Sequence, residues 1–197
     1  MMVADRPLVV WSIGHSSRAI GEFLALLQGP RIESIADVRR YAGSRAHPHF
    51  NPEPLAAALA DAGIEYCPFP ELGGRRPPLP DSPNTIWRHP NFRGYADYMD
   101  SAEFRAGLAR LVRAARERRT ALLCSEAVWW RCHRAMIADA LKAGGAEVLH
   151  IMDRGKVVAH PYTAAASIVD GVLRYGVGTD GGGDAGRRDA GRRDAGG

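Results

Sequence analysis

Short apolar runs alternate along the chain with segments in which apolar residues recur every three or four positions. Runs of strand length lie at 8–14, 33–37, 64–69, 120–124 and 147–151. Helical spacing of apolar residues lies at 20–27, 52–62, 103–119 and 131–142. Strands that alternate with helices are typical of an α/β fold. We therefore predict a mainly parallel sheet with helices on both of its faces.

Polar and turn-forming residues set the expected limits of the first two helices. Ser16 or Ser17 can cap the first helix, because a hydroxyl oxygen accepts from the free backbone N–H groups there. Asn51 followed by Pro52 is a good start for the second helix, and Gly63 would end it.

Three stretches depart from this alternation. Residues 69–100 are rich in proline, glycine and arginine, which predicts a long loop or lid. Residues 156–162 follow a turn and predict an antiparallel edge strand. From 178 onward the chain repeats DAGRR and has no large apolar residue. We therefore predict an α/β domain at 1–177 and a disordered low-complexity tail at 178–197.

The composition narrows the class of protein. Hydrophobic residues make up 46% of the 197 residues and charged residues 24%, as in soluble globular proteins, and no apolar run approaches the roughly 18 residues that span a membrane. Without a signal-peptide pattern or a cysteine framework, the chain is expected to be cytoplasmic and to have no membrane partner. The net charge of +4 permits an anionic small molecule, a nucleotide or a nucleic acid as partner. The oligomeric state is left open.

Polar and glycine-containing segments follow four of the predicted strands. They lie at 14–15, 37–40, 70–75 and 124–126. Ligands of open parallel sheets bind beyond the carboxyl ends of the strands. All four segments should therefore lie along one edge of the sheet and form the site.

The stretch CSEAVWWRCHR concentrates reactive groups at that edge. Cys124 ends a predicted strand, and Cys132 and His133 fall near the start of the next helix. The positive end of that helix and the nearby arginines would favour a thiolate at Cys124, which could act as a nucleophile. Glu126 could serve as an acid or base, or pair with an arginine.

Two other chemistries fit the same residues. Cysteines and histidines from this region could hold a metal: Cys124, Cys132, His133 and His15. The spacing is unlike a zinc knuckle, however, and adjacent side chains on a helix diverge by about 100°. A disulfide between Cys124 and Cys132 would instead make a redox switch. The cofactor is therefore left unknown.

Further polar residues should surround the cysteines. His15 follows a strand-ending glycine and is a candidate acid or base as well as an ordinary loop residue. Asp37 shares a face with Arg39, so the two can form a structural ion pair or present the arginine to an anion. Four arginines from separate elements would hold a phosphate or carboxylate, with Glu71 among them: Arg39, Arg45, Arg75 and Arg134.

Several short motifs occur together in this chain. They are Gly14-His15-Ser16, Asp37-Val38-Arg39, Gly43-Ser44-Arg45, Glu71-Leu72-Gly73-Gly74, Gly94-Tyr95 and C-x-E-x5-C-H-R from Cys124 to Arg134. With this set, residues 8–152 resemble the family called domain of unknown function 488. The resemblance implies a Rossmann-like bacterial or archaeal α/β protein and does not name a reaction. It places the site at the C-x-E-x5-C-H-R residues and adds Ser44 and Tyr95 to the candidate ligand contacts.

Three functions are compatible with these features. The leading hypothesis is an enzyme, a thiol-dependent hydrolase or transferase, acting on a phosphate-bearing ligand such as a nucleotide or nucleic-acid component. Its catalytic candidates are Cys124, Glu126, His15, Cys132 and His133. The alternatives are a non-catalytic nucleotide- or nucleic-acid-binding module, and a metal or thiol redox sensor that uses Cys124 and Cys132.

Overall fold

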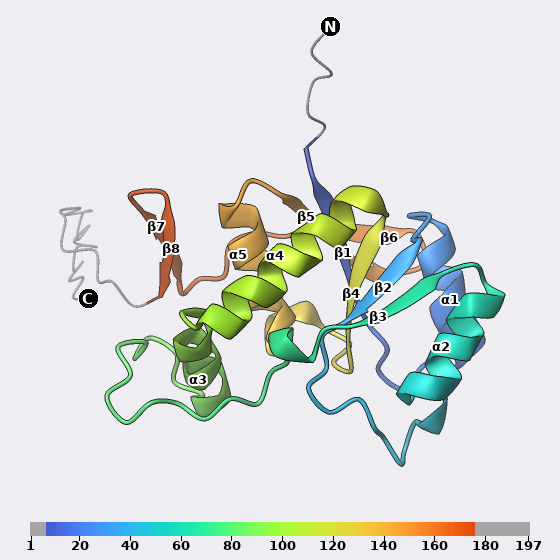
Figure 1. The fold of residues 1–197 in the computed structure, drawn as a ribbon, viewed down its shortest axis with the longest axis horizontal. Helices are drawn as coiled ribbons and strands as arrows, with labels where there is room; N and C mark the ends of the chain where they lie inside the picture. Colours follow the sequence, from blue (N-terminus) through green and yellow to red (C-terminus); the bar gives the residue numbers. More distant parts are fainter. Residues whose placement is uncertain (1–6, 176–197) are drawn as a thin grey trace, which may run out of the picture.

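The computed structural model describes residues 7–175, and its centre is a six-stranded sheet (Figure 1). The strands are β1 (Val9–Gly14), β2 (Ser34–Asp37), β3 (Glu65–Pro68), β4 (Thr120–Cys124), β5 (Glu147–Asp153) and β6 (Lys156–Ala159). Their order is β3-β2-β4-β1-β5-β6. All neighbouring pairs are parallel except β5 and β6. The mainly parallel sheet and its antiparallel edge strand are thus confirmed.

Helices cover both faces of this sheet (Figure 1). They are α1 (Ile20–Gln28), α2 (Pro52–Asp61), α3 (Pro90–Met99), α4 (Ala102–Glu117) and α5 (Arg134–Ala143). Phe23 of α1 and Leu55 of α2 are fully buried in one core. Leu111 of α4 and Met136 of α5 are fully buried in a second core on the other face. The predicted α/β fold with helices on both faces is confirmed.

The central strands supply both cores. In β1, Val10 joins the core of α4 and α5, whereas Trp11 and Ile13 join that of α1 and α2. In β4, Leu122 and Leu123 divide in the same way, and every residue of the strand is buried. Successive side chains of a strand point to opposite faces, so a strand covered on both faces consists of a continuous apolar run.

Three strands end together at the carboxyl edge. Gly14 of β1 pairs with Cys124 of β4, and Asp37 of β2 pairs with Leu123. Here β1 passes close beneath the loop that follows β4: a Cβ on Gly14 would lie 1.8 Å from the carbonyl oxygen of Glu126. Glycine is therefore required at that position, and the shared edge expected from the strand order is observed.

The turns differ from the predicted ones. The N-cap of α1 is Ala19, with no side-chain hydrogen bond, instead of either predicted serine. Ser16 adopts a left-handed backbone with φ of 51°. Helix α5 begins at Arg134, later than predicted, because Trp129–Arg131 form a short 3-10 turn, η3.

The segment 69–100 differs most from its prediction. It was expected to be a loop, yet it holds the 3-10 turn η2 (Pro70–Leu72) and helix α3. A hairpin of β7 (Ala166–Val169) and β8 (Val172–Tyr175) was also not predicted. The predicted tail at 178–197 lies outside the described residues. Between residues 7 and 175, no helix is long and apolar enough to cross a membrane.

Candidate functional site

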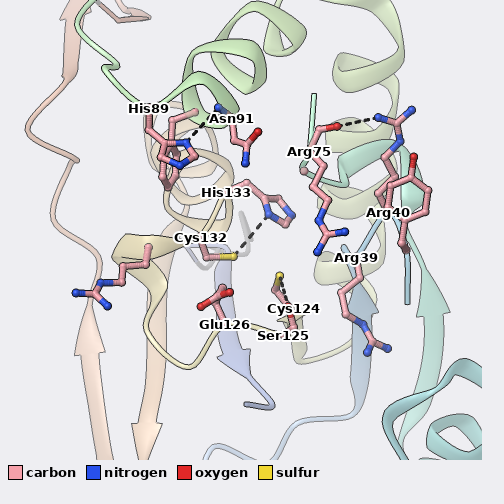
Figure 2. A pocket seen from close by; sticks show the side chains of 14 residues that line it. Arg39, Arg40, Arg75, His89, Asn91, Cys124, Ser125, Glu126, Cys132 and His133 are labelled. Atoms are coloured by element: carbon pink, nitrogen blue, oxygen red, sulfur yellow. Dashed lines mark hydrogen bonds between the residues drawn. The ribbon is translucent and has the colours of Figure 1, made fainter. Parts of the chain in front are cut away.

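A pocket of about 340 Å³ opens at the carboxyl edge of the sheet (Figure 2). Its walls come from the ends of β2 and β4, the loop after η2, the start of α3 and the turn before α5. Its volume lies in the range of small-molecule sites. The lining residues are Arg39, Arg40, Tyr41, Gly74, Arg75, His89, Asn91, Phe92, Cys124, Ser125, Glu126, Arg131, Cys132 and His133.

Two cysteines and a histidine form a compact cluster in this pocket. The Sγ atoms of Cys124 and Cys132 and a ring nitrogen of His133 all lie within 4.8 Å of one another. Nδ1 of His133 is 3.6 Å from Sγ of Cys132. Nε2 of His133 is 3.0 Å from the carbonyl oxygen of Val38. A carbonyl oxygen only accepts, so Nε2 carries a hydrogen, and Nδ1 is the ring nitrogen that faces the sulfur.

The local backbone explains why Cys132 and His133 converge. Cys132 is extended, with φ of −134° and ψ of 148°, and His133 is the residue before α5. The predicted divergence of these two side chains is wrong, because it assumed that both lie inside the helix. Gly74 leaves room for the ring, since a Cβ there would lie 2.8 Å from Nδ1 of His133.

The two cysteines differ in acidity. Interaction with Cys132, followed by burial, raises the pKa of Cys124 to about 12. Burial alone would also raise the pKa of Cys132. The interaction with Cys124 and the positive charge of Arg134 outweigh burial and lower the pKa of Cys132 to about 6. Within this coupled pair the thiolate is therefore favoured at Cys132, the residue next to the arginine, over Cys124, where it was expected.

Four arginines line the pocket, and they differ in burial. Arg39 is buried, and its Nε lies 2.8 Å from Oδ1 of Asp37, while Oδ2 of the same carboxylate accepts from the hydroxyl of Tyr66. Burial opposes the charge of Arg39, but the ion pair with Asp37 outweighs it and raises the arginine's pKa. Arg40, Arg75 and Arg131 are exposed. A fixed guanidinium therefore stands beside three that can reach a ligand.

Arg75 occupies an unusual position. Its backbone has a φ of 59°, in the left-handed region that non-glycine residues rarely adopt. Its carbonyl oxygen accepts a hydrogen bond from Nη1 of Arg40. Figure 2 shows its guanidinium pointing inward, toward His133 and the sulfur atoms. A strained backbone of this kind is found where a side chain must be aimed at a site.

Two predicted site residues support the pocket without lining it. Nδ1 of His15 is 2.8 Å from the carbonyl oxygen of Ser16, and Nε2 is 3.2 Å from Nη1 of Arg39. Burial lowers the pKa of His15 to about 4, so the ring is neutral and accepts from the arginine. Arg134 is buried and donates to the hydroxyl of Ser12 and to the carbonyl oxygen of Glu126. It holds the loop after β4 in place and does not reach the pocket.

Four other predicted residues lie elsewhere. Glu71 forms an ion pair with Arg110 of α4, with a contact of 2.6 Å. Tyr95 is fully buried, donates to the carbonyl oxygen of Leu72 and packs against the ring of His133 at 5.2 Å between centroids. The hydroxyl of Ser44 accepts from a backbone N–H in its own loop. Arg45 is exposed and lies outside the pocket lining.

Sequence reasoning missed several lining residues. Arg40 lies in the predicted site segment 37–40 and Arg131 inside the cysteine motif, but neither was named as a ligand contact although its position was a usable signal. His89, Asn91 and Phe92 surround the start of α3 and had no such signal, because their segment was read as a loop.

Comparison with known proteins identifies a family. The model of the family described as Domain of unknown function DUF488 matches residues 19–141, more than half of the chain. No curated protein and no solved structure matches the chain. The matched region runs from the start of α1 into α5 and includes the whole cysteine motif. The chain belongs to the DUF488 family.

Proposed function

We propose that the protein is an enzyme that acts on a phosphate-bearing small molecule of the nucleotide class in the carboxyl-edge pocket. One observation carries this proposal: four arginines line the same pocket as Glu126 and the cluster of Cys124, Cys132 and His133. Arginine guanidinium groups bind phosphate oxygens through paired hydrogen bonds. A pocket that only bound an anion would not need a carboxylate, two thiols and an imidazole beside it.

The roles follow from exposure and contacts. Arg75 is exposed and aimed inward, so it contacts the phosphate (Figure 2). Arg39 is locked by Asp37 and adds a fixed positive charge at the pocket wall. Glu126 is exposed at the pocket and is the group that takes or gives a proton during the reaction.

Aromatic side chains support the nucleotide class. Tyr41 is 63% exposed although it is a large aromatic residue, and it lines the pocket together with Phe92. An exposed ring beside a phosphate site offers a surface on which a base can stack. The phosphate would meet the arginines while the base meets one of these rings.

Ligand binding can be tested with inorganic phosphate as the smallest probe and nucleoside mono- and triphosphates as larger ones. Calorimetry should detect binding of at least one nucleotide, and Arg75→Gln should weaken it roughly tenfold or more, the value of one lost charged contact. Arg45→Gln is the matched control, because it removes the same charge from an exposed arginine outside the pocket. Equal losses in both variants, or no binding of any probe, would refute the proposal.

Turnover is tested separately from binding. Glu126→Gln should lower the rate of conversion of the bound nucleotide by about 10²–10⁴ and leave its affinity within a few fold, since removal of a proton-transfer group affects the chemical step. Binding with no conversion by the wild type would instead indicate the non-catalytic module, especially with a steep dependence on salt.

A further inference from the structure

We propose that Cys124, Cys132 and His133 together bind one transition-metal ion, and that the ion is zinc. The cluster lies at the floor of the pocket, between the end of β4 and the start of α5 (Figure 2). The metal site stands on geometry alone. Its catalytic role, described below, rests on the proposed function.

The distances between the donor atoms fit a shared ion. In tetrahedral zinc sites, bond lengths of about 2.3 Å to sulfur and about 2.0 Å to nitrogen place neighbouring donors roughly 3.5–3.8 Å apart. Nδ1 of His133 is 3.6 Å from Sγ of Cys132. All three donor atoms lie within 4.8 Å of one another. Small side-chain rotations therefore suffice to bring the three donor atoms to bonding distance from one ion.

The second contact of the imidazole matches that of a metal ligand. Metal-bound histidines usually donate their other N–H to a carbonyl or carboxylate, which fixes the ring and selects the nitrogen that faces the metal. In this chain Nε2 of His133 donates to the carbonyl oxygen of Val38, at the end of β2. The lone pair of Nδ1 is thereby directed into the cluster. Gly74 leaves the space next to that nitrogen free of a side chain.

The donor types select the ion. Two thiolates and an imidazole form a soft set that suits zinc and excludes magnesium and calcium, which take oxygen ligands. A cysteine nucleophile would need one thiol and one base, and this arrangement leaves the second buried cysteine without a role. A disulfide would require the two sulfur atoms to bond at about 2.05 Å, and both cysteines are free in the structure.

Three protein ligands leave one position of a tetrahedral ion open. All three ligands line the pocket, together with Glu126 and Ser125. Structural zinc sites are closed by four protein ligands, whereas a site with three keeps the fourth position for water or substrate. An ion held by these ligands would supply a water that gives its proton to the carboxylate of Glu126. The hydroxide oxygen would then bond to the phosphorus of the ligand held by the arginines while the P–O bond to the leaving group breaks. The leaving oxygen would take the proton from Glu126, so that the carboxylate is restored.

Metal content is the direct test. Protein purified without chelator should hold close to one zinc per chain by mass spectrometry of the elements. Cys124→Ser and Cys132→Ser should each lose most of it. Cys67→Ser is the matched control, because Cys67 lies in β3 outside the cluster, and it should keep the metal. Metal retained by both cluster variants would overturn the site.

A measurement on the wild type covers the case in which these variants do not fold. The apoprotein, titrated with Co²⁺ alone, should develop a thiolate-to-cobalt charge-transfer band and the visible bands of a four-coordinate ion. X-ray absorption of the zinc form should show two sulfur neighbours. Failure of the apoprotein to take up Zn²⁺ or Co²⁺, or a disulfide between Cys124 and Cys132 in freshly purified protein, would overturn the inference.

The two proposals fail separately. Arg75→Gln should keep its zinc while it loses nucleotide affinity, because the arginine belongs to the anion site and not to the ligand set. Zinc with no nucleotide binding would refute the proposed function and leave the metal site standing. Nucleotide binding by a protein that takes up no metal would refute only the metal site.

Discussion

Two clusters of buried polar side chains lie on different parts of the sheet, and their donor atoms are used in different ways. The first is the cysteine cluster of Cys124, Cys132 and His133. The second, which we call the Asp139 network, consists of Asp139, His150, His160, Thr163 and Tyr175. The carboxylate of Asp139 accepts from the ring of His160, from the hydroxyls of Thr163 and Tyr175, and from the backbone N–H of Thr163.

The Asp139 network is closed, whereas the cysteine cluster is open. His160 and Asp139 are at most 2% exposed, and Nδ1 of His160 lies 2.9 Å from Nε2 of His150. The cysteine cluster lines a pocket, and its sulfur atoms and Nδ1 face one another. A buried network built around a fully bonded carboxylate stabilises the fold, while donor atoms that converge beside a pocket are available to a ligand. Residue type alone does not distinguish a structural network from a ligand-binding cluster.

The largest effect on folding is expected from Asp139→Ala. It removes the acceptor of the buried donors of His160 and Tyr175 and of the partly buried donors of Thr163, which should lower the free energy of unfolding by about 3–5 kcal/mol. Urea unfolding measures this change. Asp81→Ala is the control, because Asp81 is exposed and its removal should cost no more than about 0.5 kcal/mol. A loss below 1 kcal/mol for Asp139→Ala would mean that the network is not structural.

Gly74→Ala should lower the metal affinity of the cysteine cluster and leave the free energy of unfolding nearly unchanged. The added methyl group would lie 2.8 Å from Nδ1 of His133 and must displace that ring. We expect zinc affinity to fall roughly tenfold to hundredfold, as for other disturbances of a ligand's setting. Competition with a chromogenic chelator measures it. Gly43→Ala, where a Cβ meets nothing within 4 Å, should leave the affinity unchanged. Equal affinities in the two variants would contradict the assignment of Nδ1.

The smallest expected effect is a pH dependence that arises in the Asp139 network. Burial, followed by the charges of His160 and Arg134, lowers the pKa of His150 to about 3. In the unfolded chain the pKa of this histidine is about 6.5, so the unfolded state binds more protons below that pH. The contribution of His150 to stability is complete above pH 6.5. It should fall by up to about 2 kcal/mol between pH 7 and pH 5.

This pH effect can be isolated with His150→Gln, which removes the titrating ring. The difference between the free energies of unfolding at pH 7 and pH 5 should be smaller in the variant than in the wild type. Asp139 and His160 remain in both proteins, so their own titration contributes to both measurements. An identical pH slope in the two proteins would show that His150 is not held neutral by its burial.

The sequence was sufficient to predict the sheet and the edge at which the candidate site lies. Apolar runs such as 120–124 are covered on both faces, so they are continuous, and parallel strands must end at one edge. Gly14, Asp37 and Cys124 therefore lie where their positions at strand ends placed them. The apolar runs predicted where each strand ends, and the parallel topology predicted that these ends share one edge.

Side-chain direction was not predictable in the same way. Arg45 and Arg134 were predicted anion contacts as Arg39 and Arg75 were. In the structure, however, Arg45 is exposed outside the pocket lining and Arg134 points beneath the loop after β4. The direction of such a side chain depends on the path of its loop or on the residue at which its helix starts. If the helix started a few residues earlier or later, the side chain would point the other way. For the same reason the convergence of Cys132 and His133 depends on η3, whose presence delays the start of α5.

The position of β4 in the sheet gives the two halves of the cysteine cluster unequal freedom. Cys124 ends a strand that is hydrogen-bonded to β1 on one side and β2 on the other, so its backbone cannot shift without moving the middle of the sheet. Cys132 and His133 lie between a short turn and a helix, outside any strand. If ions of different radius bound to the cluster, Cys132 and His133 would shift to fit them while Cys124 stayed in place. The sheet acts as the fixed reference and the turn as the adjustable part of the cluster.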